Sequence, residues 1–247
     1  MKNKGRTFFA LFALVAFFAD LVQAVTFDDY KNNYTTTYLK PLAKDLGALM
    51  GGGTFRSGRV MGFPGIDVGG DVFALTSGDS PLLKGQLFFM PYARAEVGLP
   101  ILNVDVQARA ITYSGLTIIG GGAKYALPLF PSLPAVPSPS IAAVVTYHLL
   151  TFGSWTDQLN ASTFSVNAVL SYGFPGVPIE PYIGAGMDFT SLTAKYSILP
   201  AISVSDTGTR LVGGLNLSIF PLVYATGEVG LTNSSTSFAL KVGIKLP

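Results

Sequence analysis

The single histidine, His148, is the residue best suited to acid–base chemistry, because histidine titrates near neutral pH. A His-x-Ser pair of the kind that some lipid hydrolases use needs a serine two positions later, but this chain has Leu150 there. Ser154 is only a remote candidate for the missing nucleophile. We therefore expect a hydrogen-bonded structural histidine and no enzyme. A lipid-modifying enzyme that uses His148 is the alternative.

Two carboxylates, Glu180 and Asp188, lie eight residues apart in a segment with strand character. At a rise of about 3.3 Å per residue they would be roughly 26 Å apart, too far for paired catalysis. The glycine runs at 51–53 and 120–122 lack the Lys-Ser/Thr that completes a phosphate-binding loop. With one histidine and no cysteine, no cluster has the spacing of metal ligands. We predict no catalytic residue, no metal and no cofactor.

The charged side chains after residue 65 follow a pattern with a period of two. In the segment 163–174, Phe164 and Val166 fall on one face, and Ser165 and Asn167 on the other. A strand points successive side chains to opposite sides, so this period predicts β-strands with one apolar and one polar wall. The residues expected on the polar wall are Asp67, Asp71, Arg94, Glu96, Asp105, Arg109, Lys124, His148, Glu180, Asp188, Arg210, Glu228, Lys241 and Lys245.

Ten segments share this alternation, and they predict an all-β fold. They lie near residues 66–76, 87–99, 104–113, 117–127, 139–151, 162–173, 180–192, 207–219, 222–232 and 236–246. Turns with proline alternate with polar connections, which indicates an antiparallel up-and-down meander. Single-chain bacterial barrels have an even number of strands, and eight to twelve would fit this pattern. We expect a transmembrane β-barrel over residues 57–247.

Composition decides which wall faces inward. Charged residues make up 12% of the chain and hydrophobic residues 49%, whereas soluble domains carry about 25% charged residues. No stretch after residue 25 approaches the ~18–20 apolar residues of a membrane helix. We therefore expect the apolar wall to face lipid and the charged wall to line the lumen. Its acidic and basic groups can pair almost one to one, which predicts a mostly closed lumen.

Residues 1–24 have the parts of a secretory signal peptide. A basic start is followed by an apolar core over residues 8–19 and by Val22-Gln23-Ala24 at the cleavage site. The chain has 16 basic and 14 acidic residues, of which this segment holds three and one, so 13 of each remain. A neutral mature protein gives no basis for nucleic-acid binding. We expect cleavage, residence among the lipids of the bacterial outer membrane, and the barrel-assembly machinery as a partner.

Apolar residues recur every three or four positions over residues 25–50, which is typical of an amphipathic helix. Gly51-Gly52-Gly53 would end this helix, and Pro41 would kink it or divide it in two. We expect residues 25–56 to act as a plug that occludes or abuts the periplasmic mouth, or to dock another envelope protein. The plug residues on the apolar stripe are Tyr30, Tyr34, Tyr38, Leu42 and Leu46.

The run from Tyr38 to Gly47 reads Tyr-x-x-Pro-Leu-x-x-x-Leu-Gly, and a later run, Met61 to Asp67, opens the first strand. Together with the glycines at 51–53, these runs resemble the opening of an uncharacterised family of bacterial outer-membrane β-barrel proteins. The resemblance implies residence in the outer membrane and no particular activity. More loosely, the plug is similar to that of long-chain fatty-acid transporters, which have longer chains and more strands.

These observations predict a porin-like protein of the Gram-negative envelope. We expect passive transport of small or hydrophobic solutes through a narrow or plugged lumen. One alternative is a structural or interaction barrel without transport, which binds an envelope partner through residues 25–56. The other is the lipid-modifying enzyme that uses His148.

Overall fold

A computed structural model describes residues 35–246, apart from 77, 79, 82–84, 101–102, 114, 129–137, 154–156, 175, 197–198 and 234. The expected signal peptide, Tyr30 and Tyr34 lie outside these residues. The described residues form one helix and ten strands. These are α3 (Thr36–Gly51), β1 (Ile66–Thr76), β2 (Leu87–Gly98), β3 (Val104–Tyr113), β4 (Leu116–Leu127), β5 (Ser138–Gly153), β6 (Gln158–Gly173), β7 (Ile179–Tyr196), β8 (Leu199–Phe220), β9 (Val223–Thr232) and β10 (Ser235–Leu246).

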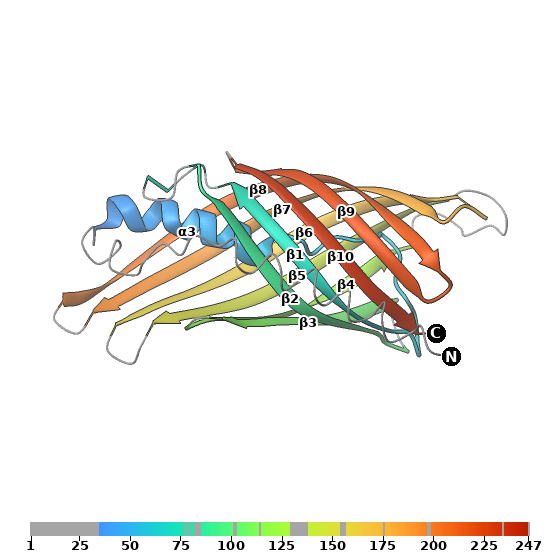
Figure 1. The fold of residues 1–247 in the computed structure, drawn as a ribbon, viewed down its shortest axis with the longest axis horizontal. Coiled ribbons are helices and arrows are strands. Elements are labelled where there is room, and N and C mark those ends of the chain that lie inside the picture. Colours follow the sequence, from blue (N-terminus) through green and yellow to red (C-terminus); the bar gives the residue numbers. More distant parts are fainter. Residues whose placement is uncertain are drawn as a thin grey trace, which may run out of the picture.

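The ten strands close into a single barrel (Figure 1). Each strand pairs antiparallel with the next one along the chain, and β1 closes the barrel by pairing with β10, from Ile66 opposite Leu246 to Leu75 opposite Ser237. Where all ten strands lie side by side, closure pairs each strand on both sides, as a bilayer requires, whereas β8 before Arg210 extends past the end of β9. The structure confirms the predicted fold class, an up-and-down antiparallel barrel of ten strands with an N-terminal helix.

The outer wall of the barrel is apolar and the inner wall is polar, the reverse of a soluble barrel. On β6, Phe164 and Val166 point outward and are each 44% exposed, whereas Thr163 and Ser165 point inward and are fully buried. The same alternation exposes Ile183 and many other large apolar side chains around the barrel. Proteins in water rarely expose such a large continuous apolar surface, so this wall is suited to contact with lipid.

Strands β5 to β8 are longer than the sequence predicts at the end where β1 finishes. The gaps between the predicted strands 139–151 and 162–173, and between 180–192 and 207–219, are largely strand, because β6 begins at Gln158, β7 ends at Tyr196 and β8 begins at Leu199. We call residues 158–162, 191–196 and 199–205 the sheet extension. Beyond its first residues at Leu199–Ala201, most of its polar residues face outward and its apolar residues pack inward on the cluster around α3, as Val204 does. Frequent serine and threonine make such strands resemble loops in the sequence.

Helix α3 is one continuous helix that includes Pro41, so the expected division into two pieces does not occur. A proline removes the hydrogen bond to the carbonyl four residues earlier, here that of Thr37. Thr37 lies in the exposed first turn, where water can satisfy that carbonyl. The helix ends at Gly51 within the glycine run, and Gly53 has a φ of 67°, which glycine adopts without strain. No helix among the described residues is both long and apolar enough to span a bilayer.

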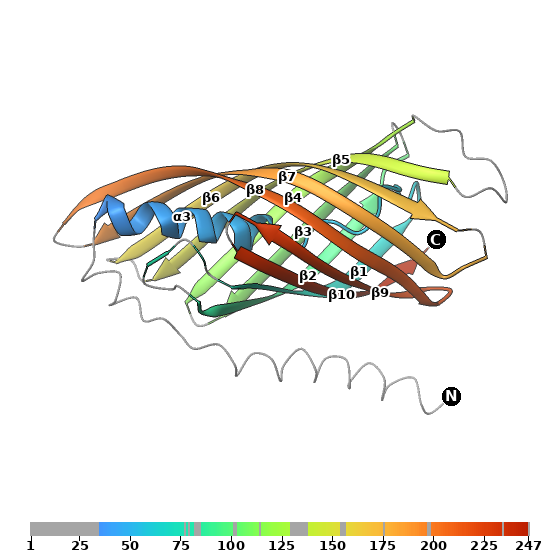
Figure 2. The same cartoon turned by 90° about the horizontal axis from the view of Figure 1, so that it is seen from above.

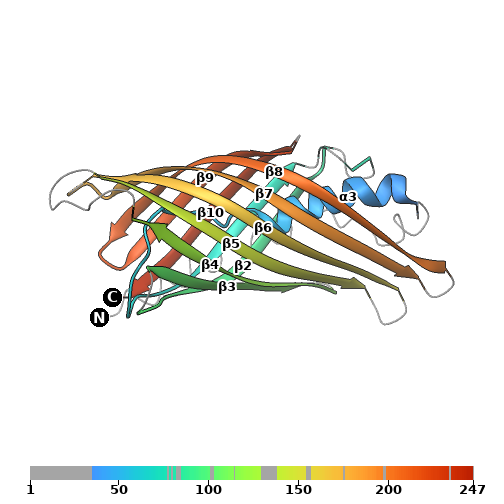
Figure 3. The ribbon, with the colours of Figure 1, turned by 180° about the vertical axis from the view of Figure 1, so that it is seen from behind.

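The helix lies inside the barrel, in the half away from the C-terminus (Figures 1 and 2). It packs mainly on β8 and β7, and Figure 3 shows the same arrangement from behind. The plug was expected at the end of the barrel where β1 begins, and this prediction is wrong. The linker, residues 52–65, separates α3 from β1, and an extended chain of this length reaches about 46 Å. That reach lets the helix sit in the opposite half of the lumen.

Candidate functional site: a lumen filled by the N-terminal segment

The structure buries most of the residues expected to line the lumen. Those that are buried are Asp67, Asp71, Arg94, Glu96, Asp105, Arg109, Lys124, His148, Asp188, Arg210, Glu228 and Lys241. Glu180 is partly buried near the rim, with a side chain 17% exposed. Lys245 is exposed instead. It faces the same side as its strand partner Asp67, but it is the second-last residue of β10, so its side chain reaches past the wall.

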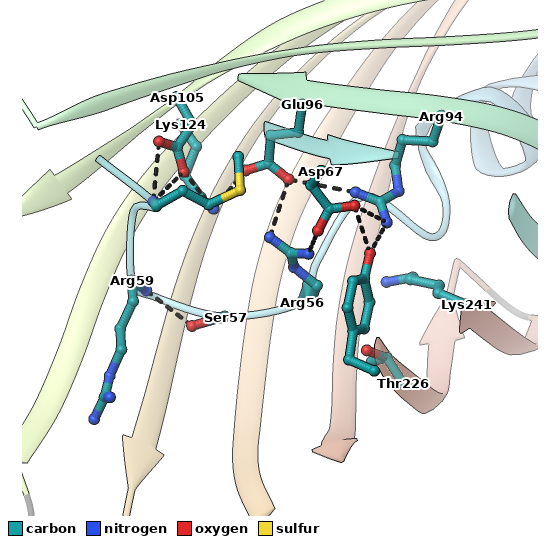
Figure 4. A network of polar contacts seen from close by, with 12 residues as sticks. Arg56, Ser57, Arg59, Asp67, Arg94, Glu96, Asp105, Lys124, Thr226 and Lys241 are labelled. Atoms are coloured by element: carbon teal, nitrogen blue, oxygen red, sulfur yellow. Dashed lines mark hydrogen bonds and ion pairs between the residues drawn. The ribbon is translucent and has the colours of Figure 1, made fainter. Parts of the chain in front are cut away.

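A network of ion pairs joins the inner faces of the adjacent strands β1 to β4 to the linker, near the beginning of β1 (Figure 4). We call it the charged network; its members are Arg56, Asp67, Asp71, Arg94, Glu96, Asp105 and Lys124. Lys124 Nζ lies 2.7 Å from Glu96 and 3.0 Å from Asp105. Arg94 lies 3.1 Å from Asp71 and 3.3 Å from Asp67. Because every member is paired, these buried charges avoid the large cost of an isolated charge.

Arg56 joins this network from the linker, and sequence reasoning did not assign it to the lumen. Its guanidinium pairs with Asp67, lies 3.3 Å from Glu96 and stacks 4.7 Å from the ring centre of Tyr224. A signal existed in the sequence. Residues 52–65 contain two arginines, Arg56 and Arg59, and no acidic residue, so they suit the carboxylates of the polar wall.

The C-terminal end of α3 is held by side chains of the wall. Four successive backbone carbonyls, from Leu49 to Gly52, accept hydrogen bonds. The donors are Tyr92 to Leu49 at 3.2 Å, Arg109 to Met50 and to Gly52 (2.7 Å), and Arg210 to Gly51. The last carbonyls of a helix have no partner within it and carry partial negative charge, so cations stabilise this end.

Arg210 has a second partner, the carboxylate of Asp188 on the neighbouring strand β7. Both side chains are essentially fully buried. Ser165 donates a hydrogen bond of 2.6 Å to the same carboxylate. Asp188 therefore holds Arg210 in the position where the guanidinium reaches Gly51.

His148 lies in the middle of the lumen wall and is 1% exposed. Its Nε2 accepts a hydrogen bond of 2.7 Å from Arg109 Nε, which makes the ring neutral with its proton on Nδ1. The ring covers Gly120 on β4, where any Cβ would collide with it. His148 thus supports the arginine that holds the helix end.

The linker is bound along its length to the inner wall. Lys241 donates a hydrogen bond to the carbonyl of Phe55, and Ser57 donates one of 2.7 Å to Glu180. The backbone N–H of Met61 lies 2.9 Å from a carboxylate oxygen of Asp105. The linker therefore fills the polar half of the lumen as α3 fills the other half.

Around α3 the lumen is apolar. Leu39, Leu42 and Met50 are buried against wall residues that include Leu150 and Leu192. Fully burying one such side chain contributes about 1.5–3 kcal/mol. Of the expected plug residues, Leu42 is buried, whereas Tyr38 and Leu46 are half-buried.

Three tyrosines of the inner wall were not predicted to line the lumen, because tyrosine was grouped with the apolar residues that were expected to face lipid. Tyr224 donates a hydrogen bond of 2.9 Å to Asp67, Tyr182 one of 2.9 Å to Glu228, and Tyr92 binds α3. Strand parity was an available signal, because Tyr92 is two residues from Arg94. Within the described part of the chain, no group of three or more His, Asp or Glu side chains is arranged to hold a metal ion.

No protein-family model and no curated protein sequence matches this chain. Among solved structures, it is similar to the N-terminal β-barrel domain of Pseudomonas aeruginosa OprF, with 14% identity over 75% of this chain and 100% of that one, and a TM-score of 0.37. It is similar to Acinetobacter baumannii Omp33, with 13% identity over 73% and 97%, at 0.33. The translocator domain of the autotransporter NalP from Neisseria meningitidis shares 12% identity over 86% and 99%, at 0.39. These are similarities of fold alone.

Proposed function

We propose that this chain is a bacterial outer-membrane protein whose lumen is sealed by its own N-terminal segment, with a structural or interaction role in the envelope. The observation that carries this proposal is the capture of four successive carbonyls at the end of α3 by Tyr92, Arg109 and Arg210. A loosely inserted plug would not need every orphan carbonyl to be bound. The apolar outer wall and the signal-peptide pattern of residues 1–24 support the location.

A second candidate is passive transport of small or hydrophobic solutes after the segment moves. The observation that favours it is the division of the lumen into a charged half around the linker and an apolar half around α3. If the segment withdrew, the wall residues of the charged network would line an aqueous path. The expected resemblance of the run Tyr38–Gly47 to an outer-membrane family fits either candidate.

A lipid-modifying activity through His148 has less support. The imidazole is buried inside the lumen, and its Nε2 is occupied by Arg109. A lipid ester in the surrounding bilayer would have to cross the barrel wall to reach it.

Conductance in planar bilayers separates the two candidates. A Cβ built on Gly47 lies 3.2 Å from the Cβ of Thr190, slightly closer than the ~3.5–4.5 Å typical of a disulfide. The chain has no native cysteine, so the pair Gly47→Cys and Thr190→Cys should cross-link α3 to β7 and nothing else. A sealed barrel predicts no steady conductance whether this variant is oxidised or reduced.

The transport candidate predicts openings of the reduced variant that disappear on oxidation, because the cross-link prevents withdrawal. A chain that starts near Arg56 is the positive control and should conduct steadily. Openings of the oxidised variant equal to those of the reduced one would contradict both candidates, since solutes would then pass with the segment in place.

A further inference from the structure

The chain passes through the barrel before it forms the wall. Thr35, Thr36 and Thr37, at the start of α3, are exposed at the end of the barrel that carries the sheet extension. Strand β1 begins at the other end, where Ile66 pairs with Leu246. Between these points, most residues from Leu39 to Ser57 are buried or half-buried inside the barrel, whereas Phe63 and Pro64 are exposed next to the beginning of β1.

Contacts with strand β7 show the path step by step. Gly47 of α3 lies against Thr190, and Gly51 against Asp188. Further along, the ring of Phe55 lies 2.9 Å from the position that a Cβ of Gly184 would occupy, and Ser57 binds Glu180 at 2.7 Å. From Gly47 to Ser57 of the segment, the residue contacted on β7 therefore changes from Thr190 to Glu180. Ten strand residues are the length of one bilayer crossing, so the segment spans the membrane inside the barrel.

The sheet extension identifies the side on which α3 begins. On β8 the outward side chains are apolar from Leu211 to Ile219 but polar at Ser203 and Ser205, so the extension projects beyond the lipid. Outer-membrane barrels have short periplasmic turns and larger extracellular parts. At the opposite end, where β1 begins and β10 ends, the connections that contain Pro100, Pro178 and Pro221 are short, and the connection between β4 and β5 is longer. The extension therefore lies on the extracellular side.

We propose that the barrel carries its own N-terminal segment across the outer membrane and presents the first turn of α3 on the cell surface. This proposal rests on the proposed location in the outer membrane. Asp28, Asp29 and Lys31 precede this turn in the sequence, and such charged side chains favour water over lipid. The barrel then acts as a holder for a surface-displayed N-terminus rather than as a pore.

Single-cysteine labelling of intact cells tests this path, because the chain has no native cysteine. The test variant is Thr37→Cys in the full chain. Lys195→Cys, exposed on the sheet extension, is the control for the outer side, and Val177→Cys, in the β6–β7 turn, is the control for the inner side. The probe is a polymer-linked maleimide too large to pass through porins.

We expect Thr37→Cys and Lys195→Cys to be labelled in intact cells, and Val177→Cys only after the outer membrane is permeabilised. Labelling of Lys195→Cys but not Thr37→Cys in intact cells would overturn the path through the lumen. Labelling of Val177→Cys alone would overturn the assigned sides. If Thr37→Cys does not insert, Thr36→Cys on the same exposed turn replaces it.

Failure of the underlying location would look different. In that case none of the three variants would react in intact cells, and the protein would fractionate without membranes. Detergent-dependent extraction of each variant, measured in the same preparation, separates this outcome from a wrong path.

Discussion

At the scale of single residues, Arg210 connects the wall to the segment inside it. Its guanidinium binds the Gly51 carbonyl and pairs with Asp188, and both charged side chains are almost fully buried. Removing one partner of a buried pair leaves the other charge without compensation, which costs about 3–5 kcal/mol. Surface ion pairs, in contrast, contribute about 0–1 kcal/mol. Stability should therefore respond more strongly to this pair than to an exposed charge such as Lys245.

We expect Arg210→Met to lower the free energy of unfolding by about 3–5 kcal/mol, measured by urea titration in lipid vesicles. The double variant Arg210→Met with Asp188→Leu should lose less than the sum of the two single losses, because no lone charge remains. Lys245→Met serves as the exposed control, with an expected change within about 0.5 kcal/mol. If the loss of unfolding free energy in the double variant equalled the sum of the two single losses, Arg210 and Asp188 would not stabilise the protein as a pair.

At the scale of elements, the sheet extension and α3 depend on each other. Inward residues of β8, such as Ile202 and Val204, pack on the apolar cluster around the helix, whereas Ser203 and Ser205 face outward. Isolated helices of fewer than about 12–15 residues are at best marginally stable in water. Helix α3, with 16 residues, is only slightly longer, so its own hydrogen bonds contribute little net stability. Burial of its apolar face against the extension therefore supplies its stability.

Two neighbouring substitutions test this dependence. Val204→Asp places a charge against the helix, and we expect backbone amides of α3 to exchange hydrogen at least about tenfold faster, equivalent to about 1.4 kcal/mol. Ser205→Asp adds the same charge to the outward face and should leave α3 exchange within about twofold. Equal effects at both positions would show that the inward face of the extension does not hold the helix.

At the scale of the whole molecule, the apolar outer wall sets where the protein is stable. Leu215 and its neighbours on β8 face outward in the middle of the apolar band, whereas Ser203 on the same strand lies beyond it. A cation at the middle of a bilayer costs about 2–4 kcal/mol on a barrel wall, and near zero outside the lipid. The position along a single strand should therefore decide the cost.

We expect Leu215→Arg to reduce the free energy of folding into lipid vesicles by about 2–4 kcal/mol, and Ser203→Arg to change it by less than about 0.5 kcal/mol. Both variants have the same new charge on the same face of β8. If the two costs were equal in vesicles, the apolar band would not coincide with the bilayer.

The wall of the barrel could be predicted from the amino-acid sequence alone. A strand exposes alternate residues to two media, so the period of two around Phe164 and Ser165 specifies both the strand and its faces. Charges such as Asp67 and Arg94 share one parity, which places them together on the inner face without knowledge of contacts. The turns with proline then specify the antiparallel order of the strands.

What fills the lumen, in contrast, could not be predicted from the sequence and is seen in the three-dimensional structure. Every residue has a backbone carbonyl, whatever its side chain. The hydrogen bonds from Arg109 and Arg210 to carbonyls at the end of α3 therefore correspond to no pattern of residue types in the sequence. The place of Arg56 and the half of the barrel that α3 occupies depend on how far the linker reaches back before β1. The sheet extension was not predicted for a related reason. Its apolar residues point inward, the reverse of the rest of the wall, and only the position of α3 explains what they pack against.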